Sequence, residues 1–299
     1  MTLRNGVTVP FVGFGCAFGN WTDNSRFMGF QPELGHFSVA AALRAGYTHF
    51  DCAYVYGSHR VVAQHVGQEL SKGKKKRSDY FLTTKVCHPW SENALNNIKK
   101  TFNFTLIPNC DIRERVFIDF ETSLDELSVG YVDLLLMHWP GAFNSIDESV
   151  GRTKRRVCWE TFEEIYTTGK TRAIGVSNFQ VRHLVALLED TKIVPMVNQI
   201  EISPYIQQPE VVSYCMEKDI KLVAWSPFGS GSTGVLTDPT IVALGKKYNK
   251  NSGQVILRWL VQKGIGVLPK SSSEDRMSYN LDIFDFEIVT EDMVKINGL

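Results

Sequence analysis

Short hydrophobic runs recur along the chain, and most are almost continuously apolar. That pattern is typical of buried parallel strands, since strands with one solvent-facing side alternate between apolar and polar residues. We predict eight strands, within residues 11–16, 48–53, 80–86, 131–139, 172–178, 195–201, 221–227 and 265–271.

The segments between these runs carry apolar residues at positions i, i+3 and i+4, the pattern of amphipathic helices. We predict helices within residues 38–46, 59–70, 111–127, 159–170, 180–190, 209–218 and 252–264. Several of them end at a glycine (Gly46, Gly169 and Gly264), which is a common helix stop. Before the first strand, Asn5–Gly6 lies between β-prone flanks and predicts a β-hairpin.

Strands that alternate with helices, without a linker or low-complexity stretch, favour one closed (β/α)8 TIM barrel. The prediction is an α/β fold in a single domain over residues 1–299, with an N-terminal β-hairpin. The alternative is an open doubly wound sheet, which requires a GxGxxG fingerprint where an early helix begins. The segment GFGCAFG at 13–19 does not open a helix with that spacing, so the barrel is preferred.

The composition limits the kinds of binding partner that the sequence predicts. Lysine plus arginine equals aspartate plus glutamate at 32 each. A chain without net charge has no overall electrostatic field that would attract it to nucleic acid or to a membrane surface. No apolar run approaches the roughly 18 residues that span a bilayer, and the N-terminus lacks the layout of a signal peptide. The six cysteines include no CxxC pair. We therefore predict reduced thiols in a cytoplasmic protein, without a metal site.

In a TIM barrel, the chemistry lies where strands end. Asp51 lies at the end of the second predicted strand and Tyr56 five residues later, Lys85 lies near the end of the third, and His138 ends the fourth. Each of these residues, taken singly, is more often a packing or ion-paired residue than a catalytic one. Four complementary ionisable groups on three neighbouring strands nevertheless indicate a site, because burying aspartate and lysine is costly unless they pair.

These residue types suit the reduction of a carbonyl group. A free tyrosine has a pKa of about 10, and a nearby Lys85 cation would lower it, making Tyr56 a proton donor near neutral pH. Asp51 would pair with Lys85, and His138 would orient the substrate oxygen. No side chain in this set supplies a hydride, so a cofactor must.

The chain resembles the aldo-keto reductases over nearly its whole length. Six motifs in order carry the resemblance: FDCAYVYGS (50–58), TTKV (83–86), YVDLLLMHWP (131–140), GKTRAIGVSNF (169–179), VNQIEISPY (197–205) and GVLPKSSSEDRMSYN (266–280). The resemblance implies an NADPH-dependent oxidoreductase that reduces aldehydes or ketones of small molecules to alcohols. It assigns catalytic roles to Asp51, Tyr56, Lys85 and His138.

The resemblance also implies a set of NADP(H)-binding residues. They are Ser177, Asn178 and Gln199 for the nicotinamide carboxamide, Trp225 for its ring, Ser226 for the phosphates, Lys270, Ser271, Ser273 and Arg276 for the adenosine 2′-phosphate, and Asn280 for adenine. Two cations with hydroxyls at a helix start suit a dianionic phosphate, which favours NADPH over NADH.

Several features depart from the family pattern and bear on the substrate. The loops after strands 1 and 3 (around residues 18–35 and 89–108) are extended, and the long C-terminal tail that often covers the substrate is absent at Leu299. Both loops emerge at the catalytic face, where they form either a replacement lid or a solvent-facing or oligomer contact. Val55, Cys87 and Trp139 are expected to line the substrate pocket, with Cys87 where the family often has tryptophan.

Two other functions stay open at this stage. Some members of the fold are redox-sensing regulatory subunits that bind cofactor and a partner protein with little turnover, although the complete catalytic set favours an enzyme. A phosphate-ligand isomerase needs a glycine-rich loop, which SPFGSGSTG at 226–234 superficially offers, but Lys270 and Arg276 favour the cofactor. A small-molecule carbonyl compound is the one partner that the sequence predicts; it does not identify protein partners.

Overall fold

The computed structural model describes residues 1–21, 27–28, 30–86, 111–141, 148–231 and 233–299. Its main sheet has eight parallel strands in the order β1-β4-β5-β6-β7-β8-β9-β10. These are β1 (Phe14–Gly15), β4 (His49–Asp51), β5 (Phe81–Val86), β6 (Leu134–Met137), β7 (Ile174–Ser177), β8 (Val197–Glu201), β9 (Lys221–Trp225) and β10 (Gly266–Leu268). Val12 pairs in parallel with Val267, so the last strand meets the first and the sheet closes into a barrel. The predicted (β/α)8 barrel is confirmed.

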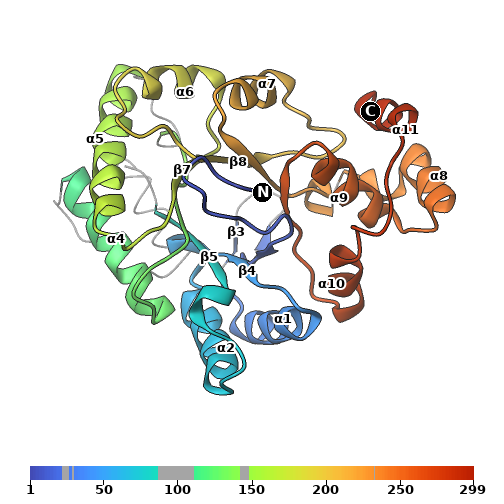
Figure 1. Ribbon diagram of the computed structural model, residues 1–299, viewed down its shortest axis with the longest axis horizontal. Coiled ribbons are helices and arrows are strands. Elements are labelled where there is room, and N and C mark those ends of the chain that lie inside the picture. Colours follow the sequence, from blue (N-terminus) through green and yellow to red (C-terminus); the bar gives the residue numbers. More distant parts are fainter. Residues whose placement is uncertain (22–26, 29, 87–110, 142–147, 232) are drawn as a thin grey trace.

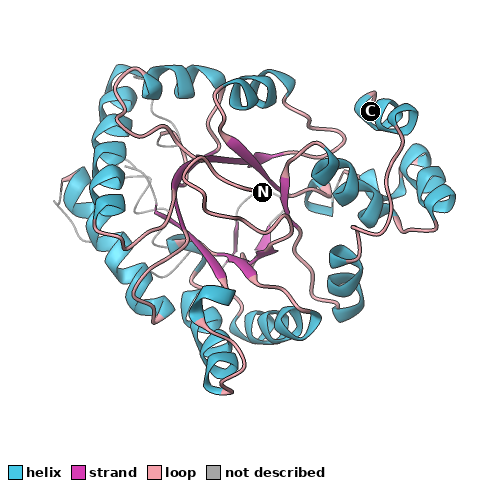
Figure 2. Cartoon of the chain, in the orientation of Figure 1, coloured by secondary structure: helices cyan, strands magenta, loops and turns pink. Residues whose placement is uncertain are grey.

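Helices surround the barrel as an outer ring, shown in cyan around the magenta strands in Figure 2. The ring consists of α1 (Pro32–Ala45), α2 (His59–Ser71), α4 (Ile112–Leu127), α5 (Glu148–Thr167), α6 (Val181–Leu188), α7 (Pro209–Glu217), α9 (Ser252–Gln262) and α10 (Glu274–Leu281). Two further helices, α8 (Pro239–Tyr248) and α11 (Thr290–Asn297), lie outside this ring at the right of Figure 1. Short 3-10 turns are η1 (Tyr54–Tyr56), η2 (Arg77–Asp79), η3 (Gly229–Gly231) and η4 (Val235–Thr237).

Each predicted strand range contains one observed strand, and each predicted helix range overlaps one observed helix. Gly46, Gly169 and Gly264 all adopt positive φ angles, as helix-ending glycines do. Two helices begin earlier than predicted: α1 at Pro32, a residue suited to a first turn, and α5 at Glu148 in a strongly charged stretch without clear apolar spacing. The helices α8, α10 and α11 lie outside the predicted helix ranges.

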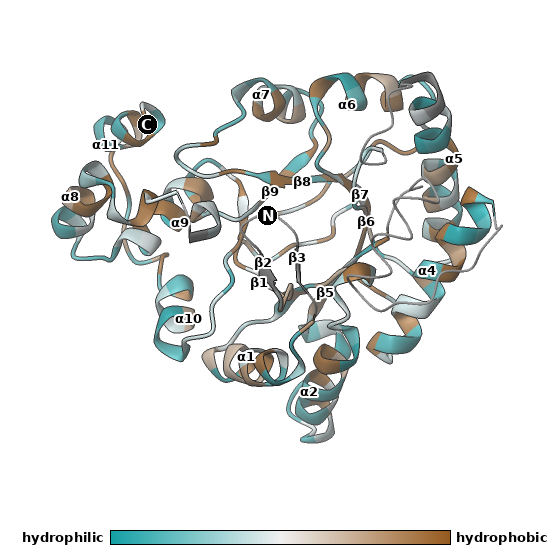
Figure 3. Ribbon diagram, turned by 180° about the vertical axis from the view of Figure 1, so that it is seen from behind, coloured by the Kyte–Doolittle hydropathy of each residue, from teal (hydrophilic) through white to brown (hydrophobic). Residues whose placement is uncertain are grey.

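The barrel interior and the layer between strands and helices form separate hydrophobic clusters. Alternate strand residues point inward, so Leu134, Leu136, Val197 and Val223 pack inside the barrel. Residues of the opposite parity pack against the helices, together with large side chains such as Trp259 on α9. Figure 3 shows brown stretches along α9, which is buried along most of its length.

The N-terminal hairpin closes the end of the barrel at which the strands begin. The Met1 ammonium donates to the Val9 carbonyl at 2.7 Å, Thr2 bridges Thr8 in antiparallel fashion, and Gly6 takes a positive φ of 83° in the turn. Leu3, Val7 and Val9 join the cluster inside the barrel. In Figure 1 this dark blue segment lies across the barrel opening, and the predicted hairpin is confirmed.

The extended loops are described in part. After β1, the strands β2 (Asn20–Trp21) and β3 (Phe27–Met28) pair antiparallel. The remainder of that loop at 22–26 and 29, and the loop predicted around 89–108 after β5, lie outside the described residues. Within the part that the structure describes, no helix has the length and apolarity to cross a membrane.

A buried histidine at the start of β4 makes stability depend on pH. His49 lies inside the barrel, 3.0 Å from the Thr83 hydroxyl through Nε2 and edge-on to Phe81. A Cβ at Gly13 would lie 2.5 Å from the ring, so only glycine fits beside it. Burial lowers the pKa of His49 to about 4, from 6.5. The unfolded chain therefore binds more protons than the folded protein between these pH values, and stability falls as the pH drops.

We expect this histidine alone to remove about 3 kcal/mol of unfolding free energy when the pH falls from 6.5 to below 4. Urea unfolding of the wild type and of His49→Gln, measured across this pH range, checks the prediction. Carboxylates also change stability as they titrate, but they do so equally in both proteins, so the difference between the two curves reports His49. The variant should lose less stability than the wild type; parallel curves for the two proteins would contradict it.

Candidate functional site

Three neighbouring strands bring polar side chains to the carboxyl end of the barrel. Asp51 ends β4, Lys85 lies near the end of β5, and His138 follows β6, with its backbone N–H donating to the Val86 carbonyl at 3.1 Å. Tyr56 closes the η1 turn, which follows β4. The four residues point to one place because they occupy inward positions or the loop directly above them.

Lys85 is at the centre of this group and is wholly buried. Its ammonium pairs with one Asp51 carboxylate oxygen, donates to the Cys52 carbonyl at 2.9 Å, and reaches the Tyr56 hydroxyl at 3.5 Å. The other Asp51 oxygen accepts a hydrogen bond from Gln199 Nε2 at 2.7 Å. A buried charge pair of this kind persists only when its remaining hydrogen-bonding positions are also satisfied, as they are here.

The electrostatics favour a charged lysine and a protonated tyrosine. Burial is the largest single effect and lowers the pKa of Lys85, but Asp51, Tyr56 and Cys52 together more than offset it, so the net pKa is raised. Burial raises the pKa of Tyr56 by more than the Lys85 cation lowers it, so the net direction is upward. Lys85 thus lowers the pKa of Tyr56, as the sequence predicted, but desolvation of the phenol raises this pKa by more. Tyr56 therefore retains its proton at neutral pH.

His138 lies beside Tyr56, with ring centroids 5.6 Å apart in an edge-on arrangement. Burial, followed by the Lys85 charge, places the pKa of His138 well below its usual range. The imidazole is therefore neutral and presents one N–H donor and one acceptor. Its Nδ1 atom is buried and has no hydrogen-bond partner among the described residues.

A second group of hydrogen bonds connects the ends of β7, β8 and β9. Asn178 Nδ2 donates to the His138 carbonyl at 2.9 Å, and its Oδ1 accepts from the Trp225 indole at 3.1 Å. Ser177 Oγ donates to the Gln199 carbonyl at 2.8 Å. Asn178 and Ser226 both have positive φ angles, 64° and 47°, which are uncommon outside glycine and concentrate at functional sites. The predicted carboxamide-binding residues and Trp225 are thus adjacent.

A third group lies where α10 begins. Ser273 is the N-cap of α10, and its hydroxyl accepts from the Arg276 N–H at 3.4 Å; Ser271 Oγ accepts from the Ser273 N–H at 3.1 Å. The Lys270 ammonium donates to the Ala17 carbonyl at 3.1 Å and, among the described residues, pairs with no carboxylate. Burial lowers the pKa of Lys270. An unpaired cation beside a helix N-terminus fits an anionic group such as the cofactor phosphate.

Comparison with known proteins decides between the remaining functions. The model of the Aldo/keto reductase family matches residues 17–299. Glyoxal reductase of Bacillus subtilis is 38% identical over 99% of this chain and 91% of its own length. The chain belongs to the aldo-keto reductase family. The structure of Bombyx mori aldo-keto reductase AKR2E4 in complex with NADP is similar with a TM-score of 0.81, at 30% identity over 100% of this chain and 91% of that one.

The family identification confirms the prediction of an NADP-dependent oxidoreductase that reduces carbonyl groups, and it does not favour the regulatory subunit. The individual residue roles stay predictions. The structure brings together the residues predicted to be catalytic in this aldo-keto reductase, and the residues predicted to bind the carboxamide lie beside them. Asn280 is buried on α10, against the Tyr47 hydroxyl. Val55 is buried and Trp139 half-buried near His138, whereas Cys87 lies outside the described residues.

Two backbone groups that the sequence did not predict contribute to the site of this reductase. The Cys52 carbonyl accepts from Lys85, and the Ala17 carbonyl accepts from Lys270. Backbone acceptors leave no signal in residue types, and only the path of the folded chain places them.

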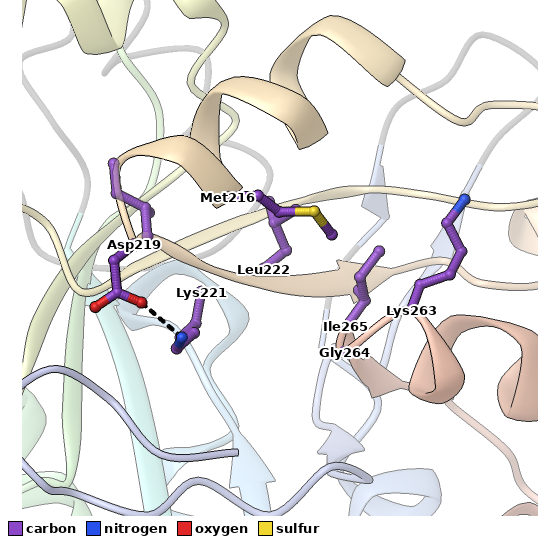
Figure 4. A pocket seen from close by; sticks show the side chains of 8 residues that line it. Met216, Asp219, Lys221, Leu222, Lys263, Gly264 and Ile265 are labelled. Atoms are coloured by element: carbon purple, nitrogen blue, oxygen red, sulfur yellow. Dashed lines mark hydrogen bonds and ion pairs between the residues drawn. The ribbon is translucent and has the colours of Figure 1, made fainter.

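One further cavity of about 200 Å³ lies away from the predicted catalytic set (Figure 4). It lies between the end of α7, the start of β9 and the end of α9, where Met216, Leu222 and Ile265 line it and Asp219 pairs with Lys221. Lys221 begins β9 whereas Trp225 ends it, so this cavity opens at the opposite end of the strand from the site.

Proposed function

We propose that this aldo-keto reductase reduces the carbonyl group of a small aldehyde or ketone with Tyr56 as the proton donor. NADPH, when bound, supplies the hydride to the carbonyl carbon. The Tyr56 hydroxyl gives its proton to the carbonyl oxygen, which becomes the alcohol. Lys85, kept charged by Asp51, stabilises the phenolate that remains, and the neutral imidazole of His138 donates a hydrogen bond to the same oxygen.

One observation carries this proposal: the Lys85 ammonium contacts both the Asp51 carboxylate and the Tyr56 hydroxyl, the latter at 3.5 Å. A cation that is desolvated with its counter-ion acts strongly on a neighbouring phenol, since little water screens it. The charge that develops on the phenolate therefore meets a preorganised partner, which is the arrangement that accelerates proton transfer.

For the substrate, we propose small aldehydes, including dicarbonyl compounds. Glyoxal reductase of Bacillus subtilis, at 38% identity, supports this class. A panel of aldehydes, ketones, dicarbonyls and sugars, followed by loss of NADPH absorbance, tests both the activity and the class. Turnover of aldehydes and dicarbonyls above sugars is expected. No carbonyl-dependent NADPH oxidation with any compound would refute the proposed function. Location in the cytoplasm and a single domain over residues 1–299 stay predictions.

The residues near α10 lead to a prediction about cofactor preference. We expect Arg276→Ala to weaken NADPH binding by about 10- to 100-fold, because a charge-assisted hydrogen bond to phosphate is worth roughly 1.5–3 kcal/mol. NADH binding should change little, since NADH has no 2′-phosphate. Titration of tryptophan fluorescence with each cofactor gives both dissociation constants.

Lys246, an exposed residue on α8 outside the ring, provides the matched control. Lys246→Ala removes one surface cation and should leave both dissociation constants unchanged. Equal losses for NADPH and NADH in Arg276→Ala would show that Arg276 does not recognise the 2′-phosphate.

A further inference from the structure

A buried histidine beside the site has no part in the proposed proton transfer. His59 is the first residue of α2, three positions after Tyr56, and its side chain is wholly buried. Its Nδ1 lies 3.2 Å from Glu126 Oε2 on α4, and its Nε2 lies 3.0 Å from Thr84 Oγ1 on β5. The single imidazole therefore connects three elements of the barrel.

The charges define the direction of these hydrogen bonds. The hydrogen bond from His59 lowers the pKa of Glu126, which is therefore a carboxylate and accepts from Nδ1–H. Burial lowers the pKa of His59 by more than Glu126 raises it, so the ring is neutral at pH 7 and its Nε2 accepts from the Thr84 hydroxyl. The other charges that act on this pair are Arg60, whose Nε lies 3.5 Å from Glu126 Oε1, and Lys85. Each polar atom of the imidazole thus has one partner.

His59 and Thr84 lie next to Tyr56 and Lys85 along the chain, and the distance between Tyr56 and Lys85 decides whether the proposed proton donor contacts the cation. Tyr56 is followed by Gly57, which turns the chain with a φ of 67°, and then by Ser58, the N-cap of α2. The Ser58 side chain forms no cap hydrogen bond, and its hydroxyl has no partner within the described ranges. The start of α2 is held instead through His59. Its partner Thr84 immediately precedes Lys85.

We propose that His59, supported by Glu126, is a positioning residue that holds the Tyr56 turn against β5 through Thr84 and so sets the distance from Tyr56 to Lys85. The proposal rests on the proposed function, in which Tyr56 is the proton donor. At 3.5 Å the contact from Lys85 Nζ to Tyr56 Oη is at the outer limit of a hydrogen bond. A small outward shift of the turn therefore breaks it.

The sharpest test changes Thr84, which is outside the proposed catalytic set. Thr84→Val removes the hydroxyl and keeps the shape, whereas Thr84→Ser keeps the hydroxyl. We expect kcat to fall about 10- to 100-fold in Thr84→Val, because displacing a catalytic group by about 1 Å can cost this much. In Thr84→Ser, kcat should stay near the wild-type value. The NADPH dissociation constant should be unchanged in both, because the residues predicted to bind the cofactor lie on other strands. The double variant His59→Gln with Thr84→Val should lower kcat no further than the more damaging of the two single variants.

Arg60→Gln is the matched control, because Arg60 contacts Glu126 from the solvent side, is 78% exposed and does not reach Thr84. It should retain the wild-type kcat. Normalising kcat to the fraction of protein that binds NADPH removes losses that come from unfolding alone. A purely structural contribution of His59 would lower that fraction and leave the normalised kcat unchanged, which would overturn the proposal.

Including Tyr56→Phe in the same assays distinguishes a failure of the positioning proposal from a failure of the proposed function. If Tyr56→Phe is inactive and Thr84→Val is fully active, the positioning proposal fails and the proposed function stands. If Tyr56→Phe remains active, the proposed function fails, and the positioning proposal fails with it.

Discussion

Replacing Tyr56 with phenylalanine is expected to lower kcat for carbonyl reduction by about 100- to 10,000-fold, the usual contribution of a positioned general acid. The ring keeps its packing beside His138, and only the hydroxyl near Lys85 is lost. NADPH binding should persist, because no predicted cofactor residue changes. Steady-state rates from NADPH absorbance, with a separate NADPH titration, distinguish lost chemistry from lost binding.

Tyr54 offers a matched control, since it is a buried tyrosine in the same η1 turn. Tyr54→Phe should retain most of the activity. Because burial raises the pKa of Tyr56 and an acid catalyst works while protonated, kcat/KM for reduction in the wild type should not decline as the pH rises from 7 to about 9. Substantial turnover by Tyr56→Phe would rule out this residue as the proton donor.

Replacing Lys85 with methionine is expected to abolish activity and to destabilise the fold by about 3–5 kcal/mol, the usual cost of leaving one partner of a buried ion pair alone. Asp51 would keep the hydrogen bond from Gln199 but lose its counter-ion, and Tyr56 would lose the cation that stabilises its phenolate. Urea unfolding measures the loss of stability, and NADPH oxidation measures the loss of activity.

Two variants make this test specific. The double variant Asp51→Asn with Lys85→Met should be more stable than Lys85→Met alone, because no unpaired charge remains, yet equally inactive. Lys170→Met breaks the ion pair between Lys170 and Glu121, whose side chains are 44% and 46% exposed. It should lower the free energy of unfolding by less than about 1 kcal/mol. Equal destabilisation by Lys85→Met and by the double variant would contradict the buried-charge explanation.

The strands, and with them the predicted site, could be predicted from the sequence because each depends on a local pattern. Continuous apolar runs indicate parallel strands, and a polar residue at the end of such a run has only the mouth of the barrel to occupy. Asp51, Lys85 and His138 were located in this way. The helix α8 also had a local signal, since Asp238 caps it and Pro239 opens it, but its apolar spacing is weak.

Features that depend on the three-dimensional neighbourhood could not be predicted in this way. His59 obtains its partners from Thr84 and Glu126, which lie far along the chain, so its residue type alone gives no indication of a connection. The direction of the Tyr56 pKa depends on how fully the phenol is desolvated, and no spacing encodes that quantity. The Cys52 and Ala17 carbonyls are backbone groups that any residue would supply.

The pairing of Val12 with Val267 has a consequence for biosynthesis. The two ends of the circular sheet are made at widely separated times during translation, so the chain must leave the ribosome at least as far as Val267 before the circle is complete. Until then the early strands present unpaired edges and the hairpin lacks most of the interior that it later covers. Truncation from the carboxyl terminus past Gly266 is therefore a route to aggregated product rather than to a smaller working enzyme.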